Sequence, residues 1–185
     1  ETEEKMKNKL FFIILFMMSL SSKEIQISIS KQELYLIEFG EISKTYKISS
    51  SKYGEGSKEN SFKTPLGKHE IKKLIGKNEQ KGMRFIGRTP SELYPIYDNE
   101  EVYVADDVVQ SRIIWLSGME EGINQGPGVD SFDRYIYIHG TPEEWLLGEK
   151  ASKGCIRMAN SDVIELFDLL SGGEIAVSYT HLTLP

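Results

Sequence analysis

Apolar and polar residues alternate along much of the chain, and this pattern predicts a series of short β-strands. In the first such segment, Ile25, Ile27 and Ile29 are separated by polar residues. A period of two residues is typical of a strand that buries one face. Similar alternation or short apolar runs predict further strands at residues 34–39, 46–48, 68–75, 85–87, 113–116, 135–139 and 174–179.

One α-helix is predicted after residue 159. Asn160 or Ser161 can cap it, Asp162 suits the positive end of its dipole, and the pair Gly172 and Gly173 stops it. The apolar residues that recur at helical spacing are Val163, Phe167 and Leu170. A second short helix would fit the remaining segments.

The segments between these elements have the composition of loops. Residues 49–61 are rich in serine, glycine and lysine, and residues 117–128 contain four glycines. Residues 89–110 fit no regular pattern, and the acidic run from Asp98 to Asp107 is interpreted as a solvated face. With no internal repeat, residues 23–179 are expected to form one mainly β domain with one or two short helices.

The N-terminal residues resemble a secretory signal. Three lysines, at positions 5, 7 and 9, precede the apolar run Leu10–Leu20, and Ser21 and Ser22 follow it. A basic flank, a short apolar stretch and small residues are typical of a signal peptide, and the run is shorter than the roughly 20 residues that span a bilayer. We therefore expect residues 1–22 to direct export to the periplasm or cell wall, with an uncleaved membrane anchor as the alternative. Residues 180–185 follow no pattern and stay unassigned.

Composition restricts the class of partner. The formal net charge is −6, which disfavours a nucleic-acid partner because binding to phosphates needs a basic surface. Hydrophobic residues make up 39% of the chain and charged residues 27%, as in soluble globular domains.

The chemistry of the chain centres on its only cysteine, Cys155. His139 precedes it by 16 residues, at the end of the predicted strand 135–139. A thiol and an imidazole can serve as nucleophile and base. In an exported protein an unpaired thiol is exposed to oxidation, which favours a functional role. The alternative is a small buried apolar side chain, a common role of free cysteine.

These residues belong to a longer motif that resembles a known signature. The segments His139–Thr141 and Ser152–Met158, with Gly148 and Asp162, are similar to the signature of the L,D-transpeptidase catalytic (YkuD-like) domain. The turn at residues 64–67 and the segments around residues 111–137 extend the resemblance, which covers about residues 24–178.

The resemblance implies a β-sandwich-like fold and an exported enzyme that acts on peptidoglycan stem peptides without a cofactor. Such enzymes cleave before a terminal D-alanine, form an acyl-enzyme on the thiol and transfer the acyl group to a side-chain amine of a second stem. The product is a cross-link between two third residues. Carbapenem-type β-lactams are then expected to acylate Cys155.

The resemblance also implies roles within the motif. His139 would be the general base and acid, oriented by the backbone carbonyl of Gly140. The N–H groups of Gly154 and Cys155 are candidates for the oxyanion hole. Arg157 would bind a carboxylate of the stem peptide, with a surface salt bridge as the alternative.

Two further motif residues, Ser152 and Lys153, are expected to line the substrate site. Lys153 stands where the family often has histidine, so it can keep positive charge near the thiolate but cannot relay a proton as imidazole does. Ser152 is a poor alternative nucleophile beside a thiol. A zinc site is also disfavoured, because His139 and Cys155 lack nearby histidine or cysteine to complete the ligand set.

The sequence leaves the acyl acceptor open. Water as acceptor would give an L,D-carboxypeptidase, and a protein amine would give attachment of a protein to the wall. A non-catalytic wall-binding module is a third alternative.

Overall fold

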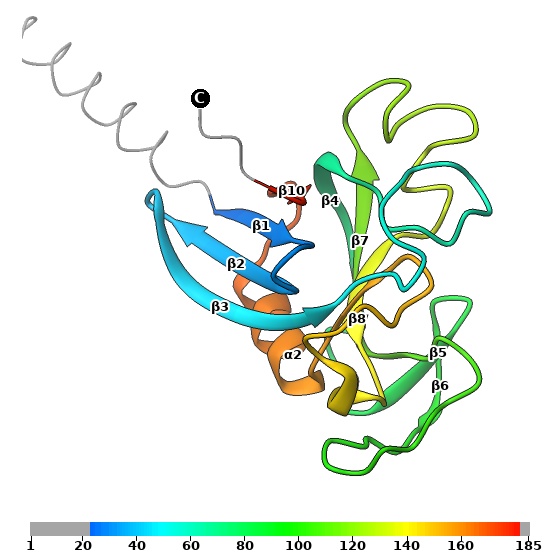
Figure 1. The fold of residues 1–185 in the computed structure, drawn as a ribbon. Helices are drawn as coiled ribbons and strands as arrows, with labels where there is room; N and C mark the ends of the chain where they lie inside the picture. The colour runs from blue at the N-terminus through cyan, green and yellow to red at the C-terminus, as the bar shows by residue number, and fades with distance from the viewer. Residues whose placement is uncertain (1–22, 182–185) are drawn as a thin grey trace, which may run out of the picture.

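The computed structural model describes residues 23–181, which form ten strands, one α-helix and one 3-10 helix (Figure 1). The helices are η1 (Glu144–Leu146) and α2 (Asn160–Leu169). The strands are β1 (Glu24–Ser28), β2 (Glu33–Glu38), β3 (Glu41–Ser49), β4 (Gly67–Ile75), β5 (Met83–Ile86), β6 (Thr89–Leu93), β7 (Val109–Gly118), β8 (Tyr137–Gly140), β9 (Ile156–Met158) and β10 (Ile175–Tyr179).

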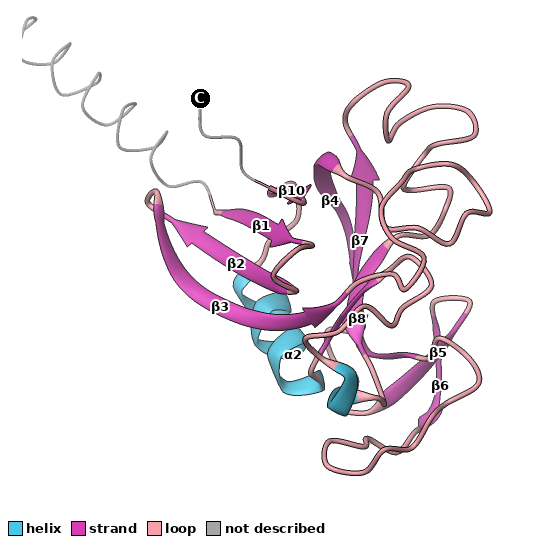
Figure 2. Ribbon diagram, in the orientation of Figure 1, coloured by secondary structure: helices cyan, strands magenta, loops and turns pink. Residues whose placement is uncertain are grey.

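The strands form one continuous sheet in the order β4-β10-β1-β2-β3-β9-β8-β7-β5-β6, and a further pairing between β4 and β7 closes it on itself. Only the pairs β1–β10 and β8–β9 are parallel among the described strands. The hairpin of β5 and β6 lies outside the closed part and extends from β7. Strands dominate and helices are few (Figure 2). The predicted fold class, a mainly β and sandwich-like domain, is therefore confirmed.

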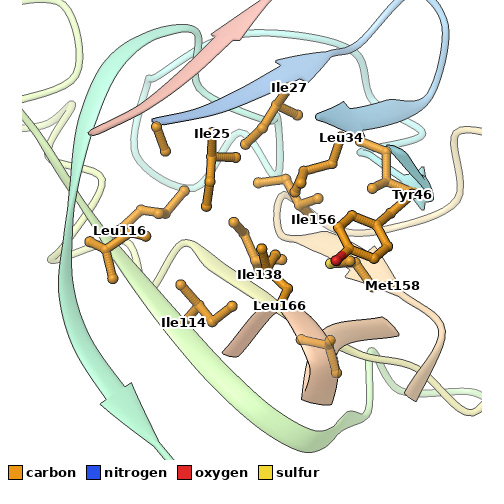
Figure 3. Close-up of a cluster of buried hydrophobic side chains, with 14 of the residues drawn as sticks. Ile25, Ile27, Leu34, Tyr46, Ile114, Leu116, Ile138, Ile156, Met158 and Leu166 are labelled. Carbon is orange, nitrogen blue, oxygen red and sulfur yellow. The ribbon is translucent and has the colours of Figure 1, made fainter. Parts of the chain in front are cut away.

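The predicted alternation determines which side chains fill the interior of the closed sheet. Ile25 and Ile27 of β1 meet Ile114 and Leu116 of β7 and Leu166 of α2 in one cluster (Figure 3). Each of these five side chains is at most 1% exposed. Complete burial of such a side chain stabilises the fold by about 1.5–3 kcal/mol relative to exposure.

Helix α2 begins and ends close to the predicted positions, but its predicted cap is wrong. The N-cap residue is Ala159, and no side chain of Asn160 or Ser161 caps the helix. The Asn160 side chain is instead buried and donates a hydrogen bond of 2.8 Å to the Thr141 carbonyl. Its backbone N–H donates to the Glu144 carboxylate at 2.7 Å. The free backbone N–H at this helix end is therefore satisfied by Glu144, which lies 16 residues earlier in the sequence. The cap propensity of the residues at the helix start cannot predict such a partner.

Two short strands were not predicted. β6 lies in the segment 89–110 that fits no pattern, and all five of its residues are exposed. With neither face in the core, β6 has no alternation to detect. β9 has only three residues, all buried, and a run of that length is too short for a period to appear.

The long connection between β7 and β8 is anchored by close polar contacts. The Asn124 side chain donates hydrogen bonds to the carbonyls of Leu66 at 2.9 Å and Lys68 at 3.1 Å. A Cβ atom at Gly118 would lie 1.9 Å from the Asn124 carbonyl oxygen. Only glycine therefore allows this approach, which positions the segment that leads into β8.

A buried histidine joins the same connection to β4. His69 is 1% exposed, and its Nδ1 and Nε2 lie 3.0 Å from the Gly67 carbonyl oxygen and the Ser131 hydroxyl, respectively. Burial lowers the pKa of His69 from 6.5 to about 4. The folded protein therefore holds this imidazole neutral at pH values where the unfolded chain binds a proton.

The segments predicted to act in export lie outside the described residues. The expectations for residues 1–22, and for residues 182–185 of the unassigned tail, therefore stay predictions. Within residues 23–181, no helix has the length and apolar character needed to cross a membrane.

The pKa of His69 predicts a pH-dependent stability. As the pH falls from 6.5 towards 4, the unfolded state takes up more protons than the folded state, so the free energy of unfolding should fall by about 3 kcal/mol from this group. In His69→Gln this part of the loss should disappear, because glutamine stays neutral. Urea denaturation at several pH values measures the effect.

The matched control is His181→Gln, which removes a second histidine at an exposed position and tests whether the effect belongs to His69. Identical pH dependence in the wild type and His69→Gln would contradict the prediction.

Candidate active site

The parallel pairing of β8 with β9 places the predicted catalytic residues on one face of the sheet. Ile138 pairs with Ile156, and His139 pairs with Arg157. Because side chains alternate between faces along a strand, His139, Arg157 and Cys155 lie on the face opposite to the core residues Ile138 and Ile156. Cys155 directly precedes β9 and so lies diagonally from His139.

Cys155 is a partly exposed residue, and its thiol contacts the backbone of β8 and of the segment just before it. Its Sγ accepts a hydrogen bond from the Tyr137 N–H and donates one to the Tyr135 carbonyl, both at 3.4 Å. The side chain packs against a second apolar cluster, separate from the main core and formed by Phe85, Ile113, Trp115 and Tyr137. Cys155 is therefore neither a member of the main core nor fully covered.

The loop before Cys155 is held by hydroxyl groups. The Ser152 hydroxyl donates to the Cys155 carbonyl at 2.6 Å and accepts from the Gly154 N–H at 3.2 Å. The Thr64 hydroxyl donates to the Gly154 carbonyl at 3.0 Å. Gly154 has φ +125°, a conformation that side chains rarely adopt. Ser152 and Gly154 thus shape the turn that presents the thiol.

One of the two N–H groups predicted to form the oxyanion hole already has a hydrogen-bond acceptor. The Gly154 N–H is directed at the Ser152 hydroxyl, so it could stabilise an oxyanion only by exchanging that bond. The predicted roles of the Gly154 and Cys155 N–H groups stay predictions, as does the predicted contact of Ser152 with substrate. Ser152 is fully buried. In this structure its hydroxyl stabilises the loop through hydrogen bonds with Gly154 and Cys155.

His139 is fully buried, and the Gly140 carbonyl lies 2.8 Å from its Nδ1. Because a carbonyl only accepts, this contact places the proton of a neutral imidazole on Nδ1 and leaves the Nε2 lone pair free. Among the described residues, Nε2 has no hydrogen-bond partner. Position 140 must be glycine here, because a Cβ atom would lie 2.4 Å from the Asn160 side-chain oxygen. The contact expected for an orienting Gly140 is therefore present.

Burial keeps both catalytic candidates neutral. It raises the pKa of the Cys155 thiol to about 12, and the negative charge of Asp107 adds to this effect. Burial also lowers the pKa of His139, while Asp107 acts in the opposite direction. The resting site therefore holds a thiol and a neutral imidazole rather than a thiolate–imidazolium pair.

Arg157 is engaged by two carboxylates. Its Nε donates to Asp107 at 2.7 Å and its Nη1 to Glu143 at 2.8 Å. The guanidinium side chain is only 5% exposed, so the alternative of a surface salt bridge is wrong in one respect: the ion pair exists, but it is buried. The predicted binding of a substrate carboxylate stays a prediction, and such a carboxylate would have to compete with Asp107 and Glu143.

Asp107 is a site residue that the sequence reasoning missed. Its carboxylate also accepts a hydrogen bond from the Lys153 N–H at 2.7 Å, so it joins Arg157 to the loop that carries the thiol. The interpretation of the whole acidic run as a solvated face is therefore wrong at this residue. Its neighbour Asp106 is exposed as expected. The sequence around the two aspartates gives no sign that one is exposed and the other is paired. The difference arises from Arg157, which is 50 residues away in the sequence.

Two hollows flank the loop that carries the thiol, and Lys153 lines both. One has a volume of about 230 Å³ and includes Asp107, Glu143 and Arg157 in its lining. The other has a volume of about 180 Å³ and includes Tyr135 in its lining. The hollows show open space on either side of the loop, and the predicted place of Lys153 at a substrate site stays a prediction. Among residues 23–181, no group of three or more histidine, cysteine or acidic side chains has the arrangement of a metal site.

Comparison with known proteins assigns the class that this fold and site indicate. The family model of the L,D-transpeptidase catalytic domain (YkuD) matches residues 22–177. The chain therefore belongs to this family, and the resemblance inferred from the motif is confirmed. No curated protein matches the chain.

Solved structures with the same fold include several L,D-transpeptidases. LdtMt1 in complex with imipenem is 17% identical with a TM-score of 0.51, over 86% of this chain and 59% of its own. An L,D-transpeptidase from Mycobacterium smegmatis is 14% identical with a TM-score of 0.51, over 86% and 59%. L,D-transpeptidase 3 from Mycobacterium tuberculosis, with a faropenem-derived adduct, is 13% identical with a TM-score of 0.51, over 85% and 60%. The chain thus spans about three fifths of the length of these proteins.

The position of Asp107 predicts how the thiol responds to pH. Because the Asp107 charge helps to raise the pKa of Cys155, Asp107→Asn should lower that pKa. Alkylation by iodoacetamide should then be faster at neutral pH, and the pH profile should move to lower pH. The thiolate fraction rises about tenfold for each unit by which the pKa falls. Mass spectrometry of the alkylated protein measures the rate.

Asp106→Asn provides the matched control, because Asp106 is exposed and should not affect the thiol. The prediction is contradicted if Asp107→Asn and the wild type are alkylated at the same rate across the pH range.

Proposed function

We propose that this protein is an exported L,D-transpeptidase that uses Cys155 as its nucleophile on peptidoglycan stem peptides. The observation that carries the proposal is the arrangement of two side chains within a domain of this family. A partly exposed thiol and a histidine with a free Nε2 lie on the same face of two paired strands. This combination supplies a nucleophile, a base and a group that orients the base.

The first half of the reaction transfers the donor peptide to the enzyme. Sγ attacks the carbonyl carbon of the third stem residue while Nε2 of His139 takes the thiol proton, giving a tetrahedral oxyanion. The bond from that carbon to the nitrogen of the terminal D-alanine then breaks. The imidazolium returns the proton to the leaving amine, so that D-alanine departs and a thioester remains on Cys155.

The second half regenerates the thiol. A side-chain amine of a second stem attacks the thioester carbonyl while His139 takes a proton from that amine. The carbon–sulfur bond breaks, the proton passes to Sγ, and the product is an amide between two third residues. The neutral resting state suits this sequence, because His139 must be unprotonated to act as a base.

The oxyanion requires donors close to the thiol. The N–H groups of Cys155 and Gly154 are the proposed donors, and one such donor typically contributes about 3 kcal/mol to transition-state stabilisation. For Gly154 this requires the Ser152 hydroxyl to release the N–H that it accepts at 3.2 Å. Lys153 would then contribute positive charge near the substrate, whereas the charge of Arg157 is already paired with Asp107 and Glu143.

Export is proposed from residues 1–22, whose basic flank and apolar run are typical of a secretory signal. The site of action would then be the periplasm or cell wall, with the leader either removed or kept as a membrane anchor. Stem peptides would be the natural partners, and a β-lactam ring would be an acylating mimic. Structures with the same fold carry imipenem or a faropenem-derived adduct, which is a reason to test β-lactams on this protein.

The activity is tested by incubating the full chain with purified tetrapeptide muropeptides. We expect release of D-alanine and formation of cross-linked dimers, followed by mass spectrometry. Cys155→Ala should lose both products while folding normally, because alanine removes only the nucleophile. His139→Gln should slow D-alanine release by roughly 100-fold or more, since it lacks the base.

The products distinguish the alternatives. Tripeptide without dimers would indicate an L,D-carboxypeptidase, and tripeptide attached to an added protein would indicate protein anchoring. Turnover that persists in Cys155→Ala would contradict the proposed nucleophile. Binding to muropeptides without turnover in the wild type would favour a wall-binding module.

A carbapenem should acylate the thiol. Incubation with imipenem should add the mass of one intact drug molecule to the wild type, because opening the β-lactam ring loses no atoms. Peptide mapping should place this mass on Cys155, and Cys155→Ala should show none. An adduct on another residue, or none on a correctly folded wild type, would contradict the prediction.

A further inference from the structure

An arginine at the tip of the β5–β6 hairpin adopts an unfavourable backbone conformation. Gly87 and Arg88 form the two-residue turn between these strands, with φ of 55° and 70°. Both residues are in the left-handed region, where glycine or asparagine is preferred in such turns and a long side chain adds strain. Strain of this kind at a single residue often accompanies a functional role of its side chain.

The Arg88 side chain folds over Trp115 of the second apolar cluster and over Tyr135, an exposed residue whose ring centroid lies 5.8 Å from that of Trp115. Its guanidinium carbon lies 4.8 Å from the ring centroid of Tyr135 and 5.2 Å from that of Trp115. Its Nη1 also donates a hydrogen bond to the Tyr137 hydroxyl at 3.3 Å. Stacking on aromatic faces and one hydrogen bond hold the planar group in a defined orientation.

Two of these aromatic residues are the ones that hold the thiol. Cys155 Sγ accepts a hydrogen bond from the Tyr137 N–H and donates one to the Tyr135 carbonyl, both at 3.4 Å. The guanidinium contacts the side chains of the same two residues. Arg88 is therefore fixed close to the nucleophile although 67 positions separate Arg88 from Cys155 in the sequence.

The charge of Arg88 is available to a ligand, unlike that of Arg157. Within residues 23–181, no carboxylate forms an ion pair with Arg88, and the residue is partly exposed. A guanidinium has five N–H donors, and the described residues accept a bond from one of them. Arg157, in contrast, is buried and already binds Asp107 and Glu143.

We propose that Arg88 binds a carboxylate of the acyl donor and thereby positions its scissile carbonyl against Cys155. A planar, stacked guanidinium with free donors matches a carboxylate in a two-point contact. The inference rests on the proposed function, and it assigns to Arg88 the role that the motif alone suggests for Arg157. The two carboxylates nearest the scissile bond are that of the terminal D-alanine and, where the third residue is a diamino diacid, that of its side chain.

Lys73 offers a matched control. It lies 5.2 Å from the ring centroid of Trp115 and 5.4 Å from that of Phe132, so it is a second cation on the same aromatic cluster. Its cation–π contacts are with Trp115 and Phe132, whereas Arg88 contacts Tyr135 and Tyr137, and its ammonium lacks the planar fork of arginine. Lys73→Gln removes one positive charge from the cluster without touching the residues that hold the thiol.

The experiment measures kcat and KM for D-alanine release by the full chain from three tetrapeptide donors. The first carries both carboxylates, the second has an amidated terminus, and the third has an amidated side chain on its third residue. The wild type should disfavour one of the amidated donors by roughly 10- to 100-fold in kcat/KM, and the identity of that donor names the carboxylate.

Arg88→Gln should lose about the same factor on the unmodified donor, mostly through KM, and should no longer discriminate between the donors. Arg88→Lys should recover part of the discrimination, and Lys73→Gln should behave as the wild type. Arg88→Gly serves as a second deletion, because glycine suits the left-handed turn and should preserve the hairpin. Thermal melting checks the fold of each variant.

Full discrimination in Arg88→Gln and Arg88→Gly would overturn the inference, as would equal losses on all three donors or an equal effect of Lys73→Gln. A folded wild type that releases no D-alanine from any donor would overturn the proposed function itself. Turnover by the wild type with unchanged discrimination in the Arg88 variants would overturn only the role of Arg88.

Discussion

The parallel pairing of β8 with β9 is the constraint on which the site depends. One register places Ile138 and Ile156 in the main core and leaves His139 and the thiol of Cys155 on the opposite face. A slip of one residue would exchange the two faces, burying the catalytic candidates in the core and exposing its isoleucines. Hydrophobic burial in the closed sheet therefore fixes the geometry of the site, although the catalytic residues contribute little to the main core.

Desolvation inside the protein shapes the electrostatics of the site, although Cys155 itself is only partly covered. Burial raises the pKa of Cys155 and lowers that of His139, so both groups are held in their neutral forms. The charges that remain are paired, with Arg157 between Asp107 and Glu143. Buried ion pairs of this kind contribute little net stability, but removing one partner leaves an uncompensated charge. Their evident effect here is to join the loop of Asp107 to the loop of the thiol.

The two arginines near the site illustrate how tertiary contacts assign roles. Arg157 is in the motif, but the fold satisfies its charge internally. Arg88 lies in no motif, yet a strained turn brings its guanidinium onto Tyr135 and Tyr137 while leaving most of its donors free. The two side chains therefore differ in how much of their hydrogen-bonding capacity the fold leaves unused, and the sequence alone does not show this difference.

The sequence by itself determined the fold class, most strands and the helix, because these depend on local periodicity, and its compact motif pointed to the family and to Cys155 and His139 as candidates. Only the tertiary structure separated Asp107 from its acidic neighbours, since its partner Arg157 is 50 residues away. The same holds for the cap of α2, where Glu144 replaces the expected side chain. β6 escaped prediction because both of its faces are exposed. Local patterns record which side chains are buried, whereas long-range contacts decide which charges and hydrogen bonds remain free for chemistry.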